Sequence, residues 1–221
     1  MQKFLSFCIA CGLCIDFSAY AENSIKQTEQ IDFSQNIDSN STVSNQFFVN
    51  LAPGVRVSSE PAQQPLSSYK WLDKKTYQLG LSDHFKIKGL IISTRHYIAD
   101  ERADIAPIDI VLGWKKMSDP TILKHINVRQ NNRFYYWHVS EFPLPRAELE
   151  LSSTNIHLIP NTKAIEAGLK KLKKGTVVEL TGYLVDVKSS DGFIWSTSRT
   201  RDDSGDGACE ILLVKQIRHL K

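Results

Sequence analysis

The segment from Thr176 to Val187 constrains the fold most, because it alternates like a strand but changes phase midway. Its apolar residues occupy even positions before Gly182 and odd positions after it: Val178 and Leu180, then Tyr183, Val185 and Val187. A glycine at such a change is typical of a bulge or sharp bend, by which a small sheet curls. We therefore expect a long strand that bends at Gly182 within a curled sheet.

Further strands are predicted where apolar residues alternate with polar ones or form short runs. These segments are Phe85 to Ile98, Ile108 to Trp114, Ile126 to Gln130, Arg133 to Val139, Phe193 to Ser198 and Ile211 to Ile217. Asn131-Asn132 and Asp191-Gly192 are turn dipeptides, so each predicts a hairpin between the runs that flank it.

The clearest helix is predicted after Pro160, where Asn161 or Thr162 can cap the first turn. Its apolar face consists of Ile165, Leu169 and Leu172. It ends in a group of cations, Lys170, Lys171, Lys173 and Lys174. Cations in a last turn complement the helix dipole, so we interpret them as a solvated face, with a phosphate or lipid-headgroup site as the alternative. A shorter helix is expected over Pro120 to His125, capped by Asp119.

These elements make the chain rich in strands, with one clear helix. With 221 residues, of which 42% are hydrophobic and 23% charged, the chain can bury a core of ordinary size. We expect an α+β fold, with a mainly antiparallel, partly closed OB-like β-barrel and at least one flanking helix. A β-sandwich is the alternative.

The N-terminus has the order of a secretory signal peptide. Lys3 precedes an apolar run from Phe4 to Ile15, and Ala19-Tyr20-Ala21 then provides the small residues of a cleavage site. The run is shorter than the roughly 20 residues that span a bilayer. We therefore expect cleavage of residues 1–21, export to the periplasm or the medium, and no membrane span. Retention as a membrane anchor, or a lipid attached at Cys11, is the alternative.

Residues 22–68 are rich in Ser, Asn, Gln and Asp and contain Pro53, Pro61 and Pro65. Such a segment buries too little apolar surface to offset the entropy lost on ordering. We expect a mostly disordered leader or linker there. The remaining residues, 69–221, have the length of a single globular domain.

The charge balance and the cysteines argue against several classes of protein. Lys+Arg 27 against Asp+Glu 24 leaves a net charge of +3, too small for the broad basic face that a nucleic-acid backbone requires. Cys8, Cys11 and Cys14 lie in the predicted signal peptide, which leaves Cys209 alone. We therefore expect neither a disulfide framework nor a Cys-rich metal site, and we expect Cys209 to be a buried, inert thiol. No cofactor is expected.

Both predicted hairpins set aromatic rings among charged groups. A two-residue loop at Asn131-Asn132 places Val128 opposite Tyr135, and the other face then carries Arg129, Phe134, Tyr136 and His138. The Asp191-Gly192 hairpin places the rings of Phe193 and Trp195 beside the charged groups of Asp186 and Lys188. This face lies away from Val185 and Val187. OB-like barrels stack bases or sugars on such faces, so we expect both faces to bind an extended ligand. The alternative is a second layer that covers the rings.

A small hydrolase is the rival interpretation. Its candidate catalytic residues are His157, Arg201, Asp203 and Glu210. Acid–base catalysis requires such groups within hydrogen-bond reach of one another. The chain contains no Gly-x-Ser-x-Gly, His-Glu-x-x-His or phosphate-loop motif, so a structural role for His157 is favoured.

The acidic segment from Asp202 to Glu210 has the clustered carboxylates and glycine turn of a calcium loop. Asp202 and Asp206 would be its metal ligands. An EF-hand pattern would place the final bidentate ligand at Leu213, which has no carboxylate. We therefore expect an acidic turn between strands and no metal site.

A series of short motifs spans the predicted domain: Leu112-Gly113-Trp114, Met117-Ser118-Asp119, Arg133-Phe134-Tyr135-Tyr136-Trp137, Asn155-x-His157-Leu158-Ile159-Pro160 and Thr200-Arg201-x-Asp203-x-Gly205-x-Gly207-Ala208-Cys209-Glu210. With these motifs the chain resembles a family of uncharacterised exported bacterial proteins over about Tyr77 to Val214. The resemblance implies an envelope or secreted setting and brings no known activity.

The sequence thus favours a non-catalytic function over an enzymatic one. We expect an exported binding or accessory module of the bacterial envelope or exterior. Its ligand would be extended, and a glycan, a peptide and a nucleic acid are the classes left open. The small hydrolase around His157 is the alternative.

Overall fold

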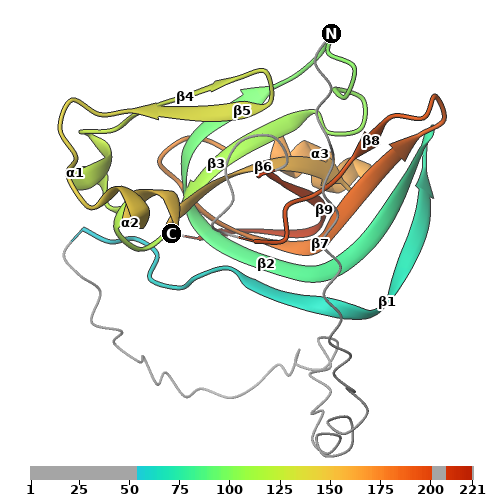
Figure 1. The fold of residues 1–221 in the computed structure, drawn as a ribbon, viewed down its shortest axis with the longest axis horizontal. Coiled ribbons are helices and arrows are strands. Elements are labelled where there is room, and N and C mark those ends of the chain that lie inside the picture. The colour runs from blue at the N-terminus through green and yellow to red at the C-terminus, as the bar shows by residue number, and fades with distance from the viewer. Residues whose placement is uncertain (1–53, 201–207, 221) are drawn as a thin grey trace, which may run out of the picture. The chain divides into compact units, whose positions relative to one another are not determined.

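The computed structural model describes residues 54–200 and 208–220, and most of these residues lie in strands (Figure 1). The strands are β1 (Ala62–Lys74), β2 (Tyr77–His96), β3 (Ile108–Gly113), β4 (Asn127–Asn131), β5 (Phe134–His138), β6 (Ser153–Pro160), β7 (Val177–Ser189), β8 (Ile194–Trp195) and β9 (Glu210–Leu220). The helices are short: the 3-10 helix η1 (Lys115–Ser118), then α1 (Pro120–Leu123), α2 (Arg146–Glu150) and α3 (Lys163–Leu169).

The main sheet closes on itself. Its strand order is β1-β2-β3-β6-β9-β7-β8, and β2 also pairs with β7, so β2, β3, β6, β9 and β7 form a ring. The pairs in this ring are antiparallel except β6 with β9, which is parallel. β2 pairs with both β3 and β7 of the ring because it is 20 residues long and bends. Its register shifts after Leu81 and after Ile91, and such bulges bend a strand. The structure agrees with the expectation of a mainly antiparallel, curled sheet with a flanking helix.

Gly182 lies where β9 approaches β7 closely. A Cβ atom at Gly182 would lie 2.0 Å from the Leu213 carbonyl oxygen, so the position requires glycine. The pairing of the two strands shifts between Thr181 and Gly182, and Lys215 of β9 has no partner in that register. The irregularity expected at Gly182 is therefore confirmed, although the extra residue belongs to β9.

The predicted change of phase in β7 is wrong, because the strand keeps one alternation along its length. Val178, Leu180 and Leu184 join the apolar cluster that fills the ring. Val185 and Val187 join a second cluster on the outer side of the sheet. Both faces of β7 are buried there, so apolar residues occur at even and at odd positions without any switch of face.

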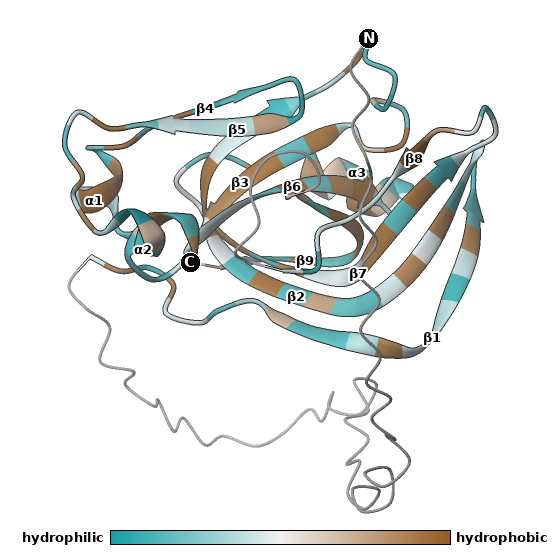
Figure 2. Ribbon diagram, in the orientation of Figure 1, coloured by the Kyte–Doolittle hydropathy of each residue, from teal (hydrophilic) through white to brown (hydrophobic). Residues whose placement is uncertain are grey.

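The cluster inside the ring takes side chains from all of its strands, among them Phe85, Ile110 and Leu158. Leu169 of α3 and Leu172 just after it join the same cluster, so α3 packs against the ring. Hydrophobic and hydrophilic residues alternate along β2 and β7, whereas β3 is mostly hydrophobic (Figure 2). This pattern follows from the burial of β3 on both of its faces.

The folded part begins before Tyr69, where the sequence analysis placed its start. Val57 is buried in the ring cluster, and its backbone amide donates to Ser118 Oγ at 2.9 Å. β1 then starts at Ala62 and pairs with β2 over Ala62–Pro65 and Lys70–Lys74, with a register shift between the two parts. Backbone pairing orders this polar segment, although its side chains bury little surface. Residues 1–53, which hold the predicted signal peptide and most of the predicted linker, lie outside the described residues.

The hairpin of β4 and β5 turns one residue later than predicted. Asn131 pairs with Phe134, so the turn residues are Asn132 and Arg133, with φ of 49° and 70°. Positive φ at both central residues is the geometry of a tight hairpin turn. Val128 therefore lies opposite Trp137 instead of Tyr135. The shift changes every cross-strand partner. It keeps each side chain on its predicted face, because each residue of β4 pairs two positions farther along β5, and side chains two positions apart lie on the same face.

The hairpin of β7 and β8 has a different loop from the predicted one, and here the faces do change. The Ser189 amide donates a hydrogen bond to the Phe193 carbonyl, so the loop between them contains three residues. Gly192 adopts a φ of 92° in this loop. Trp195 consequently pairs with Val187 and joins the second cluster. The prediction that Phe193 and Trp195 lie away from Val185 and Val187 is wrong, because an odd loop length reverses the parity.

The two predicted helices are confirmed at their starts, but α3 ends at Leu169, so the predicted last turn of cations is wrong and Lys171, Lys173 and Lys174 follow the helix. Thr162 caps α3 by accepting a hydrogen bond from the Ile165 amide at 3.2 Å. Asp119 caps α1 by accepting one from the Thr121 amide at 2.7 Å. Within the described residues, no helix is both long and apolar enough to cross a membrane.

Candidate functional site

A buried polar cluster lies on the outer face of β3 and β6. Asp109 of β3 pairs in register with His157 of β6, and both side chains point away from the ring interior. Asp109 is fully buried and His157 is 2% exposed. His157 Nδ1 lies 2.9 Å from Asp109 Oδ1, although the two atoms lack hydrogen-bond geometry. Arg133 Nη1 approaches the same oxygen at 3.1 Å, so one buried carboxylate serves two basic groups.

Arg133 reaches this carboxylate because the hairpin turn presents it to β3. Its φ of 70° is uncommon for a residue with a side chain, and the surrounding contacts hold it there. The guanidinium donates to the Ala106 carbonyl at 2.7 Å and to both carboxylate oxygens of Asp100, at 2.6 and 2.8 Å. It also stacks 3.6 Å above the centroid of the Tyr97 ring. Arg133 thus fastens the hairpin to the loop between β2 and β3.

Burial and charge together set the ionisation of this cluster. Burial raises the pKa of Tyr97 well above its usual value, and the negative charge of Asp109 raises it further. Burial alone would also raise the pKa of Asp100, but hydrogen bonds from Arg133 and the Arg102 amide outweigh it and lower that pKa. The cluster therefore keeps Asp100 charged and Tyr97 neutral near pH 7.

Trp195 and its neighbours cover the cluster. The Trp195 ring lies 4.5 Å from the His157 ring, centroid to centroid, at 49°. Arg102 in turn lies over both Trp195 and Phe193, at 4.7 and 4.5 Å from the ring centroids. Both rings are half-buried. Of the predicted ligand-binding rings, Trp195 therefore packs over His157 and Phe193 packs against Arg102, as the alternative of a covering layer anticipated.

Asn155 extends the cluster toward Cys209. Its amide nitrogen donates to the Arg133 carbonyl at 3.0 Å and lies 3.5 Å from Cys209 Sγ, while its oxygen accepts from Gln130 at 2.8 Å. Cys209 is half-buried rather than fully buried as expected. A polar network therefore joins β4, β6 and the start of β9.

Glu210 is separated from His157 by the sheet itself. It shares the alternation of Leu212, which faces the ring interior, and it accepts a hydrogen bond from Thr154 Oγ1. His157 faces the outer side. The structure thus does not bring these two candidate catalytic groups together. Arg201 and Asp203, and the candidate metal ligands Asp202 and Asp206, lie outside the described residues.

The other predicted ligand-binding residues fall on two separate surfaces. Arg129 pairs with Tyr136, and both are exposed on the outer face of the β4–β5 hairpin, with His138 exposed and Phe134 half-buried beside them. Lys188 lies elsewhere: its ammonium is 4.3 Å above the Trp71 ring of β1. We refer to Arg129, Tyr136 and His138 together as the hairpin face.

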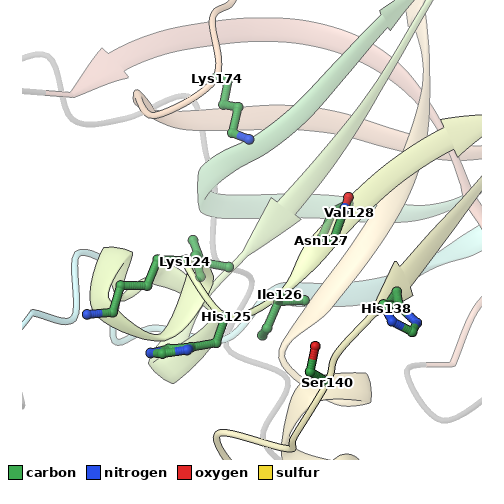
Figure 3. Close-up of a pocket in the computed structure, with 9 residues that line it drawn as sticks. Lys124, His125, Ile126, Asn127, Val128, His138, Ser140 and Lys174 are labelled. Atoms are coloured by element: carbon green, nitrogen blue, oxygen red, sulfur yellow. The ribbon is translucent and has the colours of Figure 1, made fainter.

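His138 also lines a cavity of about 480 Å³ between the hairpin, α1 and the loop before β7. In Figure 3, Lys174 points from that loop toward β4, while His138 and Ser140 lie on the opposite side. The described residues contain no group of three His, Cys, Asp or Glu side chains placed to hold a metal ion.

Sequence reasoning missed Asp109, Arg133, Asp100 and Tyr97, although one signal for them was present. Asp109 is the only charged residue in the run Ile108–Gly113, and His157 is the only polar residue in Ile156–Ile159. A charged residue in an apolar strand requires a buried partner. The sequence gives no indication of which residue that partner is.

Comparisons with models of protein families, with curated proteins and with solved structures found no match. The resemblance to exported bacterial proteins therefore stays a prediction.

Proposed function

We propose that this chain is an exported, non-catalytic binding module built on an OB-like barrel. The order of the ring supports the barrel type. In chain order the five ring strands are β2, β3, β6, β7 and β9. Around the ring they follow the order first, second, third, fifth, fourth and back to first, and the third and fifth strands, β6 and β9, are parallel. α3 lies between the third and fourth. This arrangement fits a five-stranded Greek-key barrel of OB type, a class that binds oligosaccharides and oligonucleotides.

The hairpin face is the observation that carries the proposal. Arg129 and Tyr136 are direct cross-strand neighbours, and Tyr136 is 55% exposed. His138 stands two residues along the same face. Cross-strand neighbours lie about 5 Å apart, so a cation, an aromatic ring and an imidazole can contact one ligand together. Within the described residues, no acidic side chain pairs with Arg129 or His138, which leaves both free to bind.

An extended acidic glycan is the ligand class that this face fits best. Asn127 and Asn131 lie opposite His138 and Phe134, so their amides add hydrogen-bonding groups beside the exposed ring. One ring stacks one sugar, and Arg129 can pair with an acidic substituent. Single-stranded nucleic acid stacks successive bases on several rings, whereas Tyr136 is the only exposed Phe, Tyr or Trp ring among the described residues of this hairpin.

Calorimetric titration of the full chain with polygalacturonate tests the proposal, with dextran, oligothymidylate and polyglutamate as competing ligand classes. Tyr136→Ala and Arg129→Ala should each weaken polygalacturonate binding by about tenfold, since a stacked ring contributes roughly 1–3 kcal/mol. Arg95→Ala removes an exposed arginine of β2 and serves as the matched control. Equal affinity in all variants would exclude the hairpin face, and tighter binding of another polymer would reassign the ligand class.

The hydrolase is the second candidate, because a carboxylate beside an imidazole is how many general bases are oriented. The Asp109–His157 contact at 2.9 Å is the observation that favours it. Trp195 would have to move before a substrate reached the buried imidazole. We expect wild type and His157→Gln to hydrolyse p-nitrophenyl acetate at the same rate, and a rate at least tenfold faster for wild type would favour the hydrolase.

A further inference from the structure

A second, larger cavity of about 780 Å³ adjoins the one beneath the hairpin. The two share the lining residues Leu123, Lys124, Ile126, Val128 and Lys174. Volumes of this size are typical of sites for small molecules. The larger cavity lies between the start of the described chain, β2, α1, β4 and the first residues of β7, so elements from distant parts of the sequence build it.

One wall of the larger cavity is apolar. Its apolar side chains are Val55, Leu90, Ile91, Ile92, Leu123, Ile126, Val128, Val177 and Leu220. Leu90 is buried, yet it belongs to none of the packed apolar clusters. Val177 and Leu220 are half-buried at the rim. Ile91, Ile92 and Ile126 belong to packed clusters, so the wall is the edge of the core where it borders the cavity, and an apolar ligand can pack against it.

The charged side chains around the same cavity all have one sign. They are Arg56, Lys88, Lys124 and Lys174. Among the described residues, no acidic side chain lines either cavity or forms an ion pair with any of them. By contrast, nearby Lys86 and Lys115 pair with Glu179 and Glu60. The cations of the cavity therefore lack the internal partners that neighbouring cations have.

We propose that the two adjoining cavities bind a single-chain amphipathic anion, an alkyl or acyl chain ending in a carboxylate or a phosphate. The chain lies against the wall formed by Leu90, Ile126 and Val177. The anionic head group lies near Lys174, which borders both cavities, with Lys88 or Lys124 as its second cation. Lysine suits this place because its apolar stem covers the chain while its ammonium stays at the mouth.

The inference does not rest on the proposed glycan site. The glycan would lie on Arg129 and Tyr136, and neither residue lines either cavity. His138 and Asn127 belong to both sites. A hydrophilic sugar chain gains nothing from the apolar wall, whereas an alkyl chain without a charged end leaves the cations unused. Tyr136→Ala should therefore leave binding in the cavity unchanged, so the two proposals fail separately.

Calorimetric titration of the full chain with four matched probes tests the inference: decyl phosphate, decanoate, 1-decanol and inorganic phosphate. We expect saturable binding of one or both charged decyl probes, and at least tenfold weaker binding of 1-decanol and of inorganic phosphate. Preference for decyl phosphate would indicate a phosphate head group, and equal or better binding of decanoate would indicate a carboxylate.

Variants then locate the site. Lys174→Glu should weaken the charged decyl probe by about tenfold, and Leu220→Asp should do the same through the apolar wall. Lys171→Glu, an exposed change in the same loop outside both linings, is the matched control. If Lys174→Glu does not fold, Lys124→Glu takes its place. No saturable binding, equal binding of 1-decanol, or an equal loss in Lys171→Glu would overturn the inference.

Discussion

The β4–β5 hairpin carries two arginines that the fold treats in opposite ways. Arg133 in the turn donates to Asp100, Asp109 and the Ala106 carbonyl and is 7% exposed. Arg129 in the preceding strand is exposed and has no ion-pair partner among the described residues. The two lie in one short hairpin, yet one is bound within the protein and the other faces solvent.

This difference indicates which surface is available to a ligand. Arg133 uses its hydrogen-bonding capacity to hold the hairpin against the ring, so little remains for a partner. Arg129 leaves its guanidinium free beside the exposed ring of Tyr136. A residue type alone does not distinguish the two roles; the distinction comes from what the fold places beside each side chain.

The largest expected effect separates these two arginines. Arg133→Ala leaves the buried Asp109 carboxylate without its guanidinium, and loss of one partner from a buried pair costs about 3–5 kcal/mol. Arg129→Ala should cost less than about 0.5 kcal/mol, because the residue is exposed and unpaired. Denaturant unfolding gives both free energies. Equal losses for the two variants would contradict the division into a structural and a binding arginine.

Arg133→Gly sharpens the same comparison. The φ of 70° suits glycine better than alanine, so the glycine variant removes the guanidinium without backbone strain. We expect it to be about 0.5–1 kcal/mol more stable than Arg133→Ala and still far less stable than wild type. A glycine variant as stable as wild type would show that the ion pairs contribute nothing.

The next effect compares two aromatic rings predicted from sequence to share one role. Trp195→Ala should cost about 2–3 kcal/mol, somewhat below the value for a full core tryptophan, because Trp195 is half-buried over His157. Tyr136→Ala should cost less than about 1 kcal/mol, since the ring is exposed. Ile194→Ala, beside Trp195 and 60% exposed, is the control. A small loss for Trp195→Ala would return that ring to the set of ligand-binding candidates.

Local patterns predicted most strands and both main helices, because apolar alternation and capping residues act over a few positions. Loop length did not follow from them: Asp191-Gly192 suggested an even loop, but a positive φ at Gly192 closes an odd one and reverses the face of Trp195. The buried cluster could not be predicted as a unit either. Asp109 and Arg133 are 24 residues apart in sequence, and only the closed sheet and the hairpin bring them together.

The smallest effect concerns pH and the outer end of the Arg133 network. Asp100 has a lowered pKa in the folded state, since the hydrogen bonds from Arg133 and the Arg102 amide outweigh burial. A carboxylate with a lowered pKa stabilises the fold above its unfolded pKa of about 3.9, and that contribution is lost as pH falls through the folded value.

Asp100→Asn should therefore lower the melting temperature slightly at pH 7 and make its decline between about pH 5 and pH 2 shallower than in wild type. The effect is small because the Asp100 side chain is 37% exposed, which screens its pairing with Arg133. Glu101→Gln, at an exposed neighbouring position, should keep the wild-type profile. Parallel pH profiles for wild type and Asp100→Asn would mean that the Asp100 carboxylate contributes nothing to stability. Asp109 would then be the one of the two carboxylates whose pairing with Arg133 stabilises the fold.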